Sequence, residues 1–330
     1  MKNIFILIIL FISLSGKACD ICNIYEYANR KNKNYIGLYY RYRFFNGYAF
    51  QNDPHDFHLN TENLRDSKAR TNHEPNFDEA SVNKSPKDYQ LFQTIEIRGN
   101  YVLKEKINIQ AIIPYVWNTV YYKQSITFPK QMIDTTLRLS GIGDPILAFD
   151  YIQVFETGMI RHILKPGIGI KFPLGKYDAI GANGRRYEYD IQAGTGSFDF
   201  ILRANYTITN DTWGVDAFIN HRLNTWGKND MLLGDKSNLM LTTYYTLKIK
   251  ELSILPRIGV YYEWALRDRI HKEIINFSGG NTFFLQTGID LMYKNFIIQS
   301  LYQHPLRENL NGQVIGNAGR FNVGVIYNFD

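Results

Sequence analysis

The chain has 330 residues, of which 45% are hydrophobic and 15% aromatic, and its formal net charge is +6. Its mean hydropathy of −0.28 resembles that of a soluble protein. After the first residues no apolar run reaches the roughly 18 residues of a membrane-spanning helix, which excludes a helical membrane protein. The basic residues are scattered along the sequence, so we expect no nucleic-acid partner.

The first eighteen residues have the features of a secretory signal peptide. Lys2 supplies the positive charge, an unbroken apolar run covers 4–12, and Gly16-Lys17-Ala18 places small residues at the two positions that a signal peptidase reads. We therefore predict a signal peptide over 1–18, a periplasmic N-terminal segment over 19–34 and a membrane domain over 35–330.

Two cysteines, Cys19 and Cys22, stand together at the start of the expected mature chain. In an oxidising compartment they are most simply a local disulfide or a pair without a special role. Lipidation of Cys19 is an alternative, although Lys17 is unusual in a lipidation signal. A metal site is a third alternative, and it lacks the second pair of ligands that a four-coordinate site needs. The sequence leaves all three open.

The rest of the chain repeats one pattern, a segment of about ten residues in which apolar and polar side chains alternate. In residues 35–45, for example, Ile36 and Leu38 share one face, whereas Arg41 and Arg43 share the other. The pattern predicts twelve strands, an even number as in closed bacterial barrels. The predicted strands are 35–45, 91–103, 107–117, 142–154, 162–174, 197–208, 212–223, 238–249, 253–265, 282–293, 296–304 and 319–329.

Short and long connections alternate between these predicted strands, and this decides the topology. The short ones are 104–106, 156–158, 209–211, 250–251 and 294–295, and the long ones are 46–88, 118–140, 175–190, 224–236, 266–281 and 305–318. Short periplasmic turns and long external loops are typical of outer-membrane barrels. We therefore predict an all-β fold, a closed antiparallel transmembrane β-barrel of about twelve strands in the outer membrane of a Gram-negative cell.

Such a barrel needs two partners, the lipid of the outer membrane and the machinery that inserts barrels into it. Its first and last strands must also pair, because unpaired backbone groups in lipid cost several kcal/mol each. We expect residues 321–329 to lie antiparallel to residues 35–45.

The polar face of the predicted strands carries many charges, which a dry core could not hold unpaired. They can line a hydrated lumen, either by filling it and holding the barrel shut or by forming a narrow polar conduit, and the sequence leaves both open. Asp144 belongs to this face, together with the fifteen residues that we predict to line the lumen: Arg41, Arg43, Glu96, Arg98, Asp150, Lys165, Lys171, Asp199, Arg203, Asp216, Arg222, Arg257, Glu263, Asp290 and Arg320.

Loop 46–88 holds His55 and His58 in His-Asp-Phe-His, then His73, with several carboxylates nearby. Imidazole and carboxylate ligands can bind Zn²⁺ or Cu²⁺, but a solvated loop of this composition is the more common case. The sequence contains no Gly-x-Ser-x-Gly, and we identify no catalytic residues and no cofactor, so we do not expect an enzyme.

Three glycine-containing blocks resemble a known family. They are Gly141-Ile142-Gly143-Asp144-Pro145, the stretch from Gly167 to Gly175, and Gln192-Ala193-Gly194-Thr195-Gly196-Ser197. Together they resemble the outer-membrane transporters of the MetA-pathway phenol-degradation family, and the N-terminal Cys-Asp-Ile-Cys further resembles its Bacteroidetes members. The resemblance covers less than half of the chain. It implies a barrel that passes small, often aromatic or apolar, compounds, and it supplies no catalytic residues.

The sequence therefore predicts a passive channel or transporter for a small-molecule solute. The alternative is a non-conducting barrel with a structural role, or one that binds a metal or another partner through loop 46–88.

Overall fold

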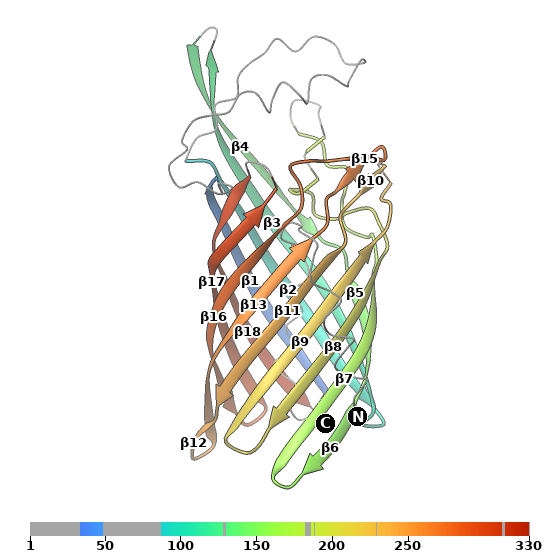
Figure 1. Cartoon of the computed structure of the whole chain (residues 1–330), viewed down its shortest axis with the longest axis vertical. Helices are drawn as coiled ribbons and strands as arrows, with labels where there is room; N and C mark the ends of the chain where they lie inside the picture. The colour runs from blue at the N-terminus through green and yellow to red at the C-terminus, as the bar shows by residue number, and fades with distance from the viewer. Residues whose placement is uncertain are drawn as a thin grey trace, which may run out of the picture.

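The protein is described by a computed structural model, which covers residues 34–48, 87–127, 130–181, 186–187, 189–228, 230–311 and 314–329. Every regular element in these ranges is a β-strand, and no helix among them has the length and apolar character to cross a bilayer. The strands (Figure 1) are β1 (Asn34–Tyr48), β2 (Tyr89–Leu103), β3 (Ile107–Thr127), β4 (Lys130–Ile142), β5 (Ile146–Tyr151), β6 (Gln153–Thr157), β7 (Ile160–Lys171), β8 (Asp199–Thr209), β9 (Trp213–Asn224), β10 (Met231–Leu232), β11 (Lys236–Tyr245), β12 (Leu247–Ile249), β13 (Leu252–Ala265), β14 (Arg269–Ile270), β15 (Glu273–Ile274), β16 (Gly280–Tyr293), β17 (Phe296–Leu310) and β18 (Ile315–Phe329).

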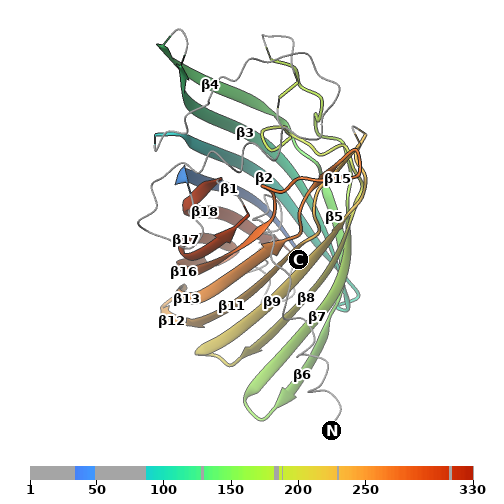
Figure 2. The same cartoon turned by 45° about the horizontal axis from the view of Figure 1, so that its top comes forward.

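These strands form one closed antiparallel barrel whose wall is twelve strands around (Figures 1 and 2). The fourth wall strand consists of β4, β5 and β6 in succession, and the eighth consists of β11 and β12. Three further short strands, β10, β14 and β15, form a small separate sheet. The predicted all-β, twelve-stranded barrel is confirmed.

The ring closes between the first and the last strand, as predicted. Pairing runs from Asn34 opposite Phe329 to Tyr42 opposite Phe321, without a break in register. All strand pairs in the wall are antiparallel, so the backbone donors and acceptors of the wall are satisfied within the sheet, as lipid requires.

The two faces of the wall differ sharply in chemistry. Ile36 and Leu38 are each 53% exposed on the outside, whereas Tyr39 and Arg41, one position along, are 2% and 4% exposed. The same alternation continues around the ring, and it leaves an apolar outer surface that only a bilayer can cover. The protein therefore has the surface of an outer-membrane β-barrel.

Two predicted external loops are in fact mostly strand. Residues 118–140 belong largely to β3 and β4, which extend together above the rim of the barrel (Figure 1), and residues 305–318 belong largely to β17 and β18. The backbones of these segments continue to pair although their sequences do not alternate strictly between apolar and polar residues, so the pattern predicts loops where strands are present. The predicted short turns are observed; at 104–106, for example, Lys104 and Glu105 both have positive φ values, as a tight two-residue turn needs.

Several predictions lie outside the described residues. They include the signal peptide and its cleavage, the segment 19–34 with Cys19 and Cys22, and His55, His58 and His73 in loop 46–88. Of that loop, the structure describes only residues 46–48 and 87–88.

Deleting residues 321–330 should prevent assembly, because β1 and β17 would both face lipid with unpaired backbone groups that cost several kcal/mol each. We expect loss of the heat-modifiable migration on gels that a folded barrel gives, and degradation in the periplasm. A chain that lacks only Asp330 is the control and should assemble. Insertion of the truncated chain with normal resistance to external protease would contradict closure through β18.

Candidate functional site

The interior of the barrel is the candidate site, since it is where the predicted charges meet. All fifteen predicted residues are buried, none with more than 6% of its surface exposed. They occupy alternate positions on the wall strands, opposite in phase to the exposed apolar residues. Their predicted role as the lining of a solute path remains a prediction.

Asp150 and Arg203 form a two-point ion pair in the interior. Arg203 Nε and Nη2 donate to the two carboxylate oxygens of Asp150 at 2.7 and 2.6 Å, and Arg203 Nη1 donates to Gln110 at 2.9 Å. Gln110 in turn donates to the Tyr35 hydroxyl at 3.0 Å. The network therefore links β8 to β5, β3 and β1 along the inner wall.

Gly167 makes this ion pair possible. It lies on β7, between the strands that carry Asp150 and Arg203, and it pairs with both residues. A Cβ atom at Gly167 would lie only 1.9 Å from Asp150 Oδ1. The absence of a side chain thus leaves room for the carboxylate to lie over β7, where the guanidinium reaches it from the far side.

A second cluster surrounds Glu96 on β2. Its carboxylate accepts from Arg41 at 2.5 Å and from Arg98 Nε and Nη2 at 2.8 and 2.5 Å. The Arg98 guanidinium also lies over the Tyr39 ring, 4.1 Å from its centroid. The single Glu96 carboxylate offsets part of the free-energy cost of burying the two positive charges. The face of the Tyr39 ring attracts the Arg98 guanidinium in addition.

Two more ion pairs lie on the side of the ring formed by β13, β16 and β18. Arg320 donates through both terminal nitrogens to Glu263 at 2.7 and 2.6 Å, and Arg257 lies 3.0 Å from Asp290. Asp216, on β9, accepts from Asn205 at 2.9 Å and from Thr207 at 2.5 Å. The polar lining is therefore a cross-strand network in which opposite charges meet.

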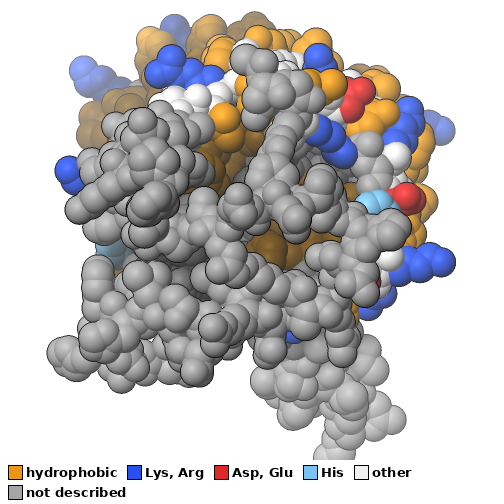
Figure 3. Space-filling model, turned by 90° about the horizontal axis from the view of Figure 1, so that it is seen from above, with side chains coloured by type: hydrophobic (Ala, Val, Ile, Leu, Met, Phe, Trp, Pro, Cys, Tyr) orange, Lys and Arg blue, Asp and Glu red, His pale blue; other side chains and the backbone are white. Residues whose placement is uncertain are grey.

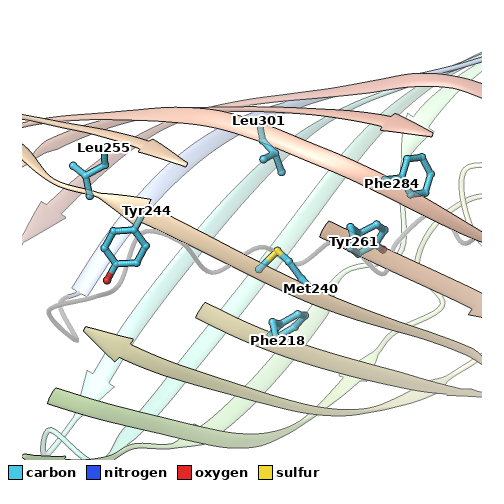
Figure 4. Close-up of a cluster of buried hydrophobic side chains, with 7 residues drawn as sticks. All are labelled: Phe218, Met240, Tyr244, Leu255, Tyr261, Phe284 and Leu301. Carbon is cyan, nitrogen blue, oxygen red and sulfur yellow. The ribbon is translucent and has the colours of Figure 1, made fainter. Parts of the chain in front are cut away.

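An apolar row interrupts this polar lining. Phe218, Met240, Tyr261 and Phe284 are buried and lie directly opposite one another on the neighbouring strands β9, β11, β13 and β16. Figure 4 shows their side chains together with three further members of the same cluster. The Tyr261 and Phe284 rings are 5.8 Å apart, close enough for favourable aromatic contact.

The alternating pattern of the sequence does not predict this row. Phe218 stands between Asp216 and Asn220 at alternate positions of β9, all of them inward. The alternation identifies each face of a strand by its dominant polarity, so a single apolar residue on the polar face does not stand out. The position of Phe218, two residues from both Asp216 and Asn220, is the sequence signal that places it on the inward face.

The three glycine-containing blocks meet at Asp144, which lies between β4 and β5. Its Oδ1 accepts from the backbone N–H of Gly175 at 2.9 Å, and its Oδ2 accepts from the N–H of Thr195 at 2.9 Å and from Lys171 Nζ at 3.0 Å. Lys171 also lies 2.7 Å from Asp199. Asp144 and Lys171 are fully buried, so this cluster, the Asp144 knot, is a paired charge centre in the wall.

The Asp144 knot ties a long connection, residues 172–198, to the inner wall. Gly175 and Gly194 touch so closely that a Cβ atom at Gly175 would lie 2.8 Å from the Gly194 Cα. Ile191 is 1% exposed, and its carbonyl accepts from the Asn118 side chain of β3 at 2.9 Å. The connection therefore folds back onto the inward side of β3.

Among the described residues no group of three or more His, Cys, Asp and Glu side chains could hold a metal ion. The predicted ligands His55, His58 and His73 lie outside those residues, so the metal site in loop 46–88 remains a prediction.

Comparison with known proteins identifies solved structures with a similar fold. No family model and no curated protein matches the chain. Among solved structures, a COG4313 outer membrane channel from Pseudomonas putida F1 is similar with a TM-score of 0.58 and 14% identity, over 90% of this chain and 96% of that one. The β domain of the Bordetella autotransporter BrkA (TM-score 0.45, 10% identity, 90% and 99% covered) and a Pseudomonas aeruginosa FadL homologue (0.41, 11%, 90% and 91%) are also similar. The first similarity shows a shared outer-membrane β-barrel fold.

Replacing Gly167 with Val should destabilise the barrel by about 3 kcal/mol, because the new side chain displaces Asp150 and leaves the Arg203 charge buried and unpaired. Gly99→Val is the matched control, since nothing lies within 4 Å of a Cβ atom at that strand position. The measurement is the urea midpoint of refolding into detergent micelles. Equal midpoints for the two variants would show that the ion pair does not depend on Gly167.

Replacing Asp144 with Asn should release the connection 172–198, because an amide cannot accept from Lys171, Gly175 and Thr195 together, and each buried donor left unpaired costs about 1–3 kcal/mol. We expect new cleavage within 172–198 when intact cells are treated with protease. Asp211→Asn, in a periplasmic turn, is the control. Unchanged protection of the Asp144→Asn variant would contradict the anchoring role.

Proposed function

We propose that this barrel is a passive outer-membrane channel for small apolar or aromatic compounds, with the row Phe218–Met240–Tyr261–Phe284 as the contact surface for the solute. The observation that carries the proposal is that an apolar row of four side chains crosses four neighbouring strands on the inward face of a wall otherwise lined with polar groups.

The chemistry of the row suits such a solute. Removing apolar surface from water contributes about 25 cal/mol per Å². Aromatic rings and a methionine thioether also add specific contacts with a flat aromatic molecule. Tyr261 and Phe284 supply the rings from adjacent strands, and Met240 lies opposite Tyr261.

The row has polar borders on both sides. One position further along these strands on the inward face are Asn220, Asn238, Glu263 and Thr282, and on the other side are Asp216, Thr242 and Gln286. The four side chains are at most 4% exposed and pack against one another, so an apolar solute would reach this band where their mutual contacts open. Within the row only the Tyr261 hydroxyl can form hydrogen bonds, so a polar solute would leave most of its hydrogen-bonding groups without a partner there, which supports selection for apolar compounds.

We also infer membership of the MetA-pathway phenol-degradation family. The support is that the three blocks that carry the resemblance, far apart in sequence, converge on the Asp144 knot. Because the three blocks contact one another around Asp144, one structural requirement explains why they occur together in the sequence.

Intact cells that produce the barrel should take up 1-N-phenylnaphthylamine, an aromatic probe that fluoresces in apolar surroundings, faster than cells without it. Phe218→Asn should slow this uptake about tenfold, which corresponds to roughly 1.4 kcal/mol. Phe218→Leu, which keeps the surface apolar, should retain most of it.

The cells that are compared must contain equal amounts of folded barrel, as judged by heat-modifiable migration. Ile219→Leu, on the lipid face next to Phe218, is the matched control. In parallel, liposomes with the purified protein should swell little in arabinose. Fast swelling with unaffected probe uptake in Phe218→Asn would indicate a polar pore. No passage of either compound would indicate a non-conducting barrel.

A further inference from the structure

A groove of about 520 Å³ lies on the outside of the barrel, over β1 to β4. The residues that matter for its chemistry are Tyr40, Gln93, Trp117, Thr119, Arg138 and Ser140. It faces away from the lumen and has no role in the proposed solute path.

The chemistry of the outward side chains of β3 and β4 changes along the groove. Along β4 they change from Ile142, which is 57% exposed, to Ser140 and then to the exposed Arg138. Their partners on β3 change in step, with Tyr115 opposite Ile142, Trp117 opposite Ser140 and Thr119 opposite Arg138. The surface therefore passes from apolar to hydrogen-bonding to cationic within five residues of one strand.

Aromatic residues surround the same level of the wall. The Tyr115 and Trp117 rings are 4.7 Å apart, and the Tyr89 and Tyr121 rings stack at 5.2 Å, with Tyr121 two outward positions beyond Trp117 on β3. Aromatic girdles mark the boundary between lipid chains and headgroups in outer-membrane barrels. These aromatic residues belong to the parts of β2 and β3 nearest the end at which β3 and β4 extend above the rim of the barrel (Figure 1), and we therefore place the groove at the headgroup level of the outer leaflet.

The described residues that line the groove offer hydrogen-bond donors and carry no negative charge. Arg138 supplies a guanidinium, and Thr119 and Ser140 supply hydroxyls. The Tyr40 hydroxyl donates to Gln93 Oε1 at 2.7 Å, which fixes the Gln93 amide. No Asp or Glu is among the residues that line the groove. Seen from above, both Lys or Arg and Asp or Glu side chains stand at the outer edge of the described part of the molecule (Figure 3), so the absence of carboxylates is a local property of the groove.

We propose that this groove binds the phosphorylated sugar headgroup of an outer-leaflet glycolipid. A guanidinium pairs with a phosphate through charge-assisted hydrogen bonds, and hydroxyl and amide groups pair with sugar hydroxyls. The apolar residues just below, Ile95 and Ile142, would contact the first carbons of the acyl chains. Headgroup and chains are thus recognised together, at the one level of the wall where both are present.

The test is retention of a bisphosphorylated lipid A by the purified full-length barrel, measured by native mass spectrometry after exchange into detergent. The unmodified protein should retain one lipid per barrel. Arg138→Ala should weaken retention about fivefold, whereas Arg138→Lys should lose less, because it keeps the charge but not the paired donors. Arg161→Ala is the matched control, since Arg161 is an exposed arginine at the opposite end of the barrel that pairs with Glu156 at 3.0 Å.

Competition separates the possible sources of the phosphate. Millimolar inorganic phosphate and phosphatidylethanolamine should each leave lipid A bound. Displacement by inorganic phosphate alone would mean an anion site without lipid recognition, and would overturn the proposal. Equal retention by the Arg138→Ala and Arg161→Ala variants, each still heat-modifiable, would overturn it as well.

Discussion

The structure depends on one constraint, that inside a bilayer the backbone donors and acceptors of a strand must be paired by another strand. Water is absent there, and each unpaired group costs several kcal/mol. The pairing of β1 with β18 completes the ring and removes the two edges that an open sheet would present. Once the ring is closed, every side chain of the wall points either to lipid or to the interior. The division between apolar and charged residues follows from this.

The interior then poses the opposite problem, because charges that are removed from water need partners. Arg203 meets its partner Asp150 over β7, and Gly167 leaves the space for that contact. Glu96 pairs with Arg41 and Arg98, and Glu263 accepts hydrogen bonds from both terminal nitrogens of Arg320. Arg320 also lies over the Phe284 ring, 4.3 Å from its centroid, so the charged lining and the apolar row are in direct contact.

The wall could be predicted from the sequence because lipid imposes a strong two-residue period, as Ile36 and Leu38 illustrate. The prediction failed where lipid is absent. The upper part of β3 and β4 extends above the rim of the barrel, and its sequence does not alternate between apolar and polar residues, so the pattern there predicts a loop. The row that begins at Phe218 was missed because chemistry inside the barrel varies from strand to strand and has no single period. The blocks of the Asp144 knot were recognised separately. Their meeting requires residues 172–198 to fold back onto the wall, which no local pattern encodes.

The closure of the ring also has a consequence for the order of folding. Asn34 and Phe329 pair although roughly 300 residues separate them, and bringing such distant segments together first would cost about 5 kcal/mol of chain entropy. The hairpin of β2 and β3, joined by 104–106 alone, can form in microseconds at little entropic cost. Hairpins should therefore form first and the seam last, so the growing sheet keeps two open edges until its final strand arrives. Those edges are templates for pairing with other chains. The chain therefore has to be protected from aggregation from the time it leaves the inner membrane until the seam closes.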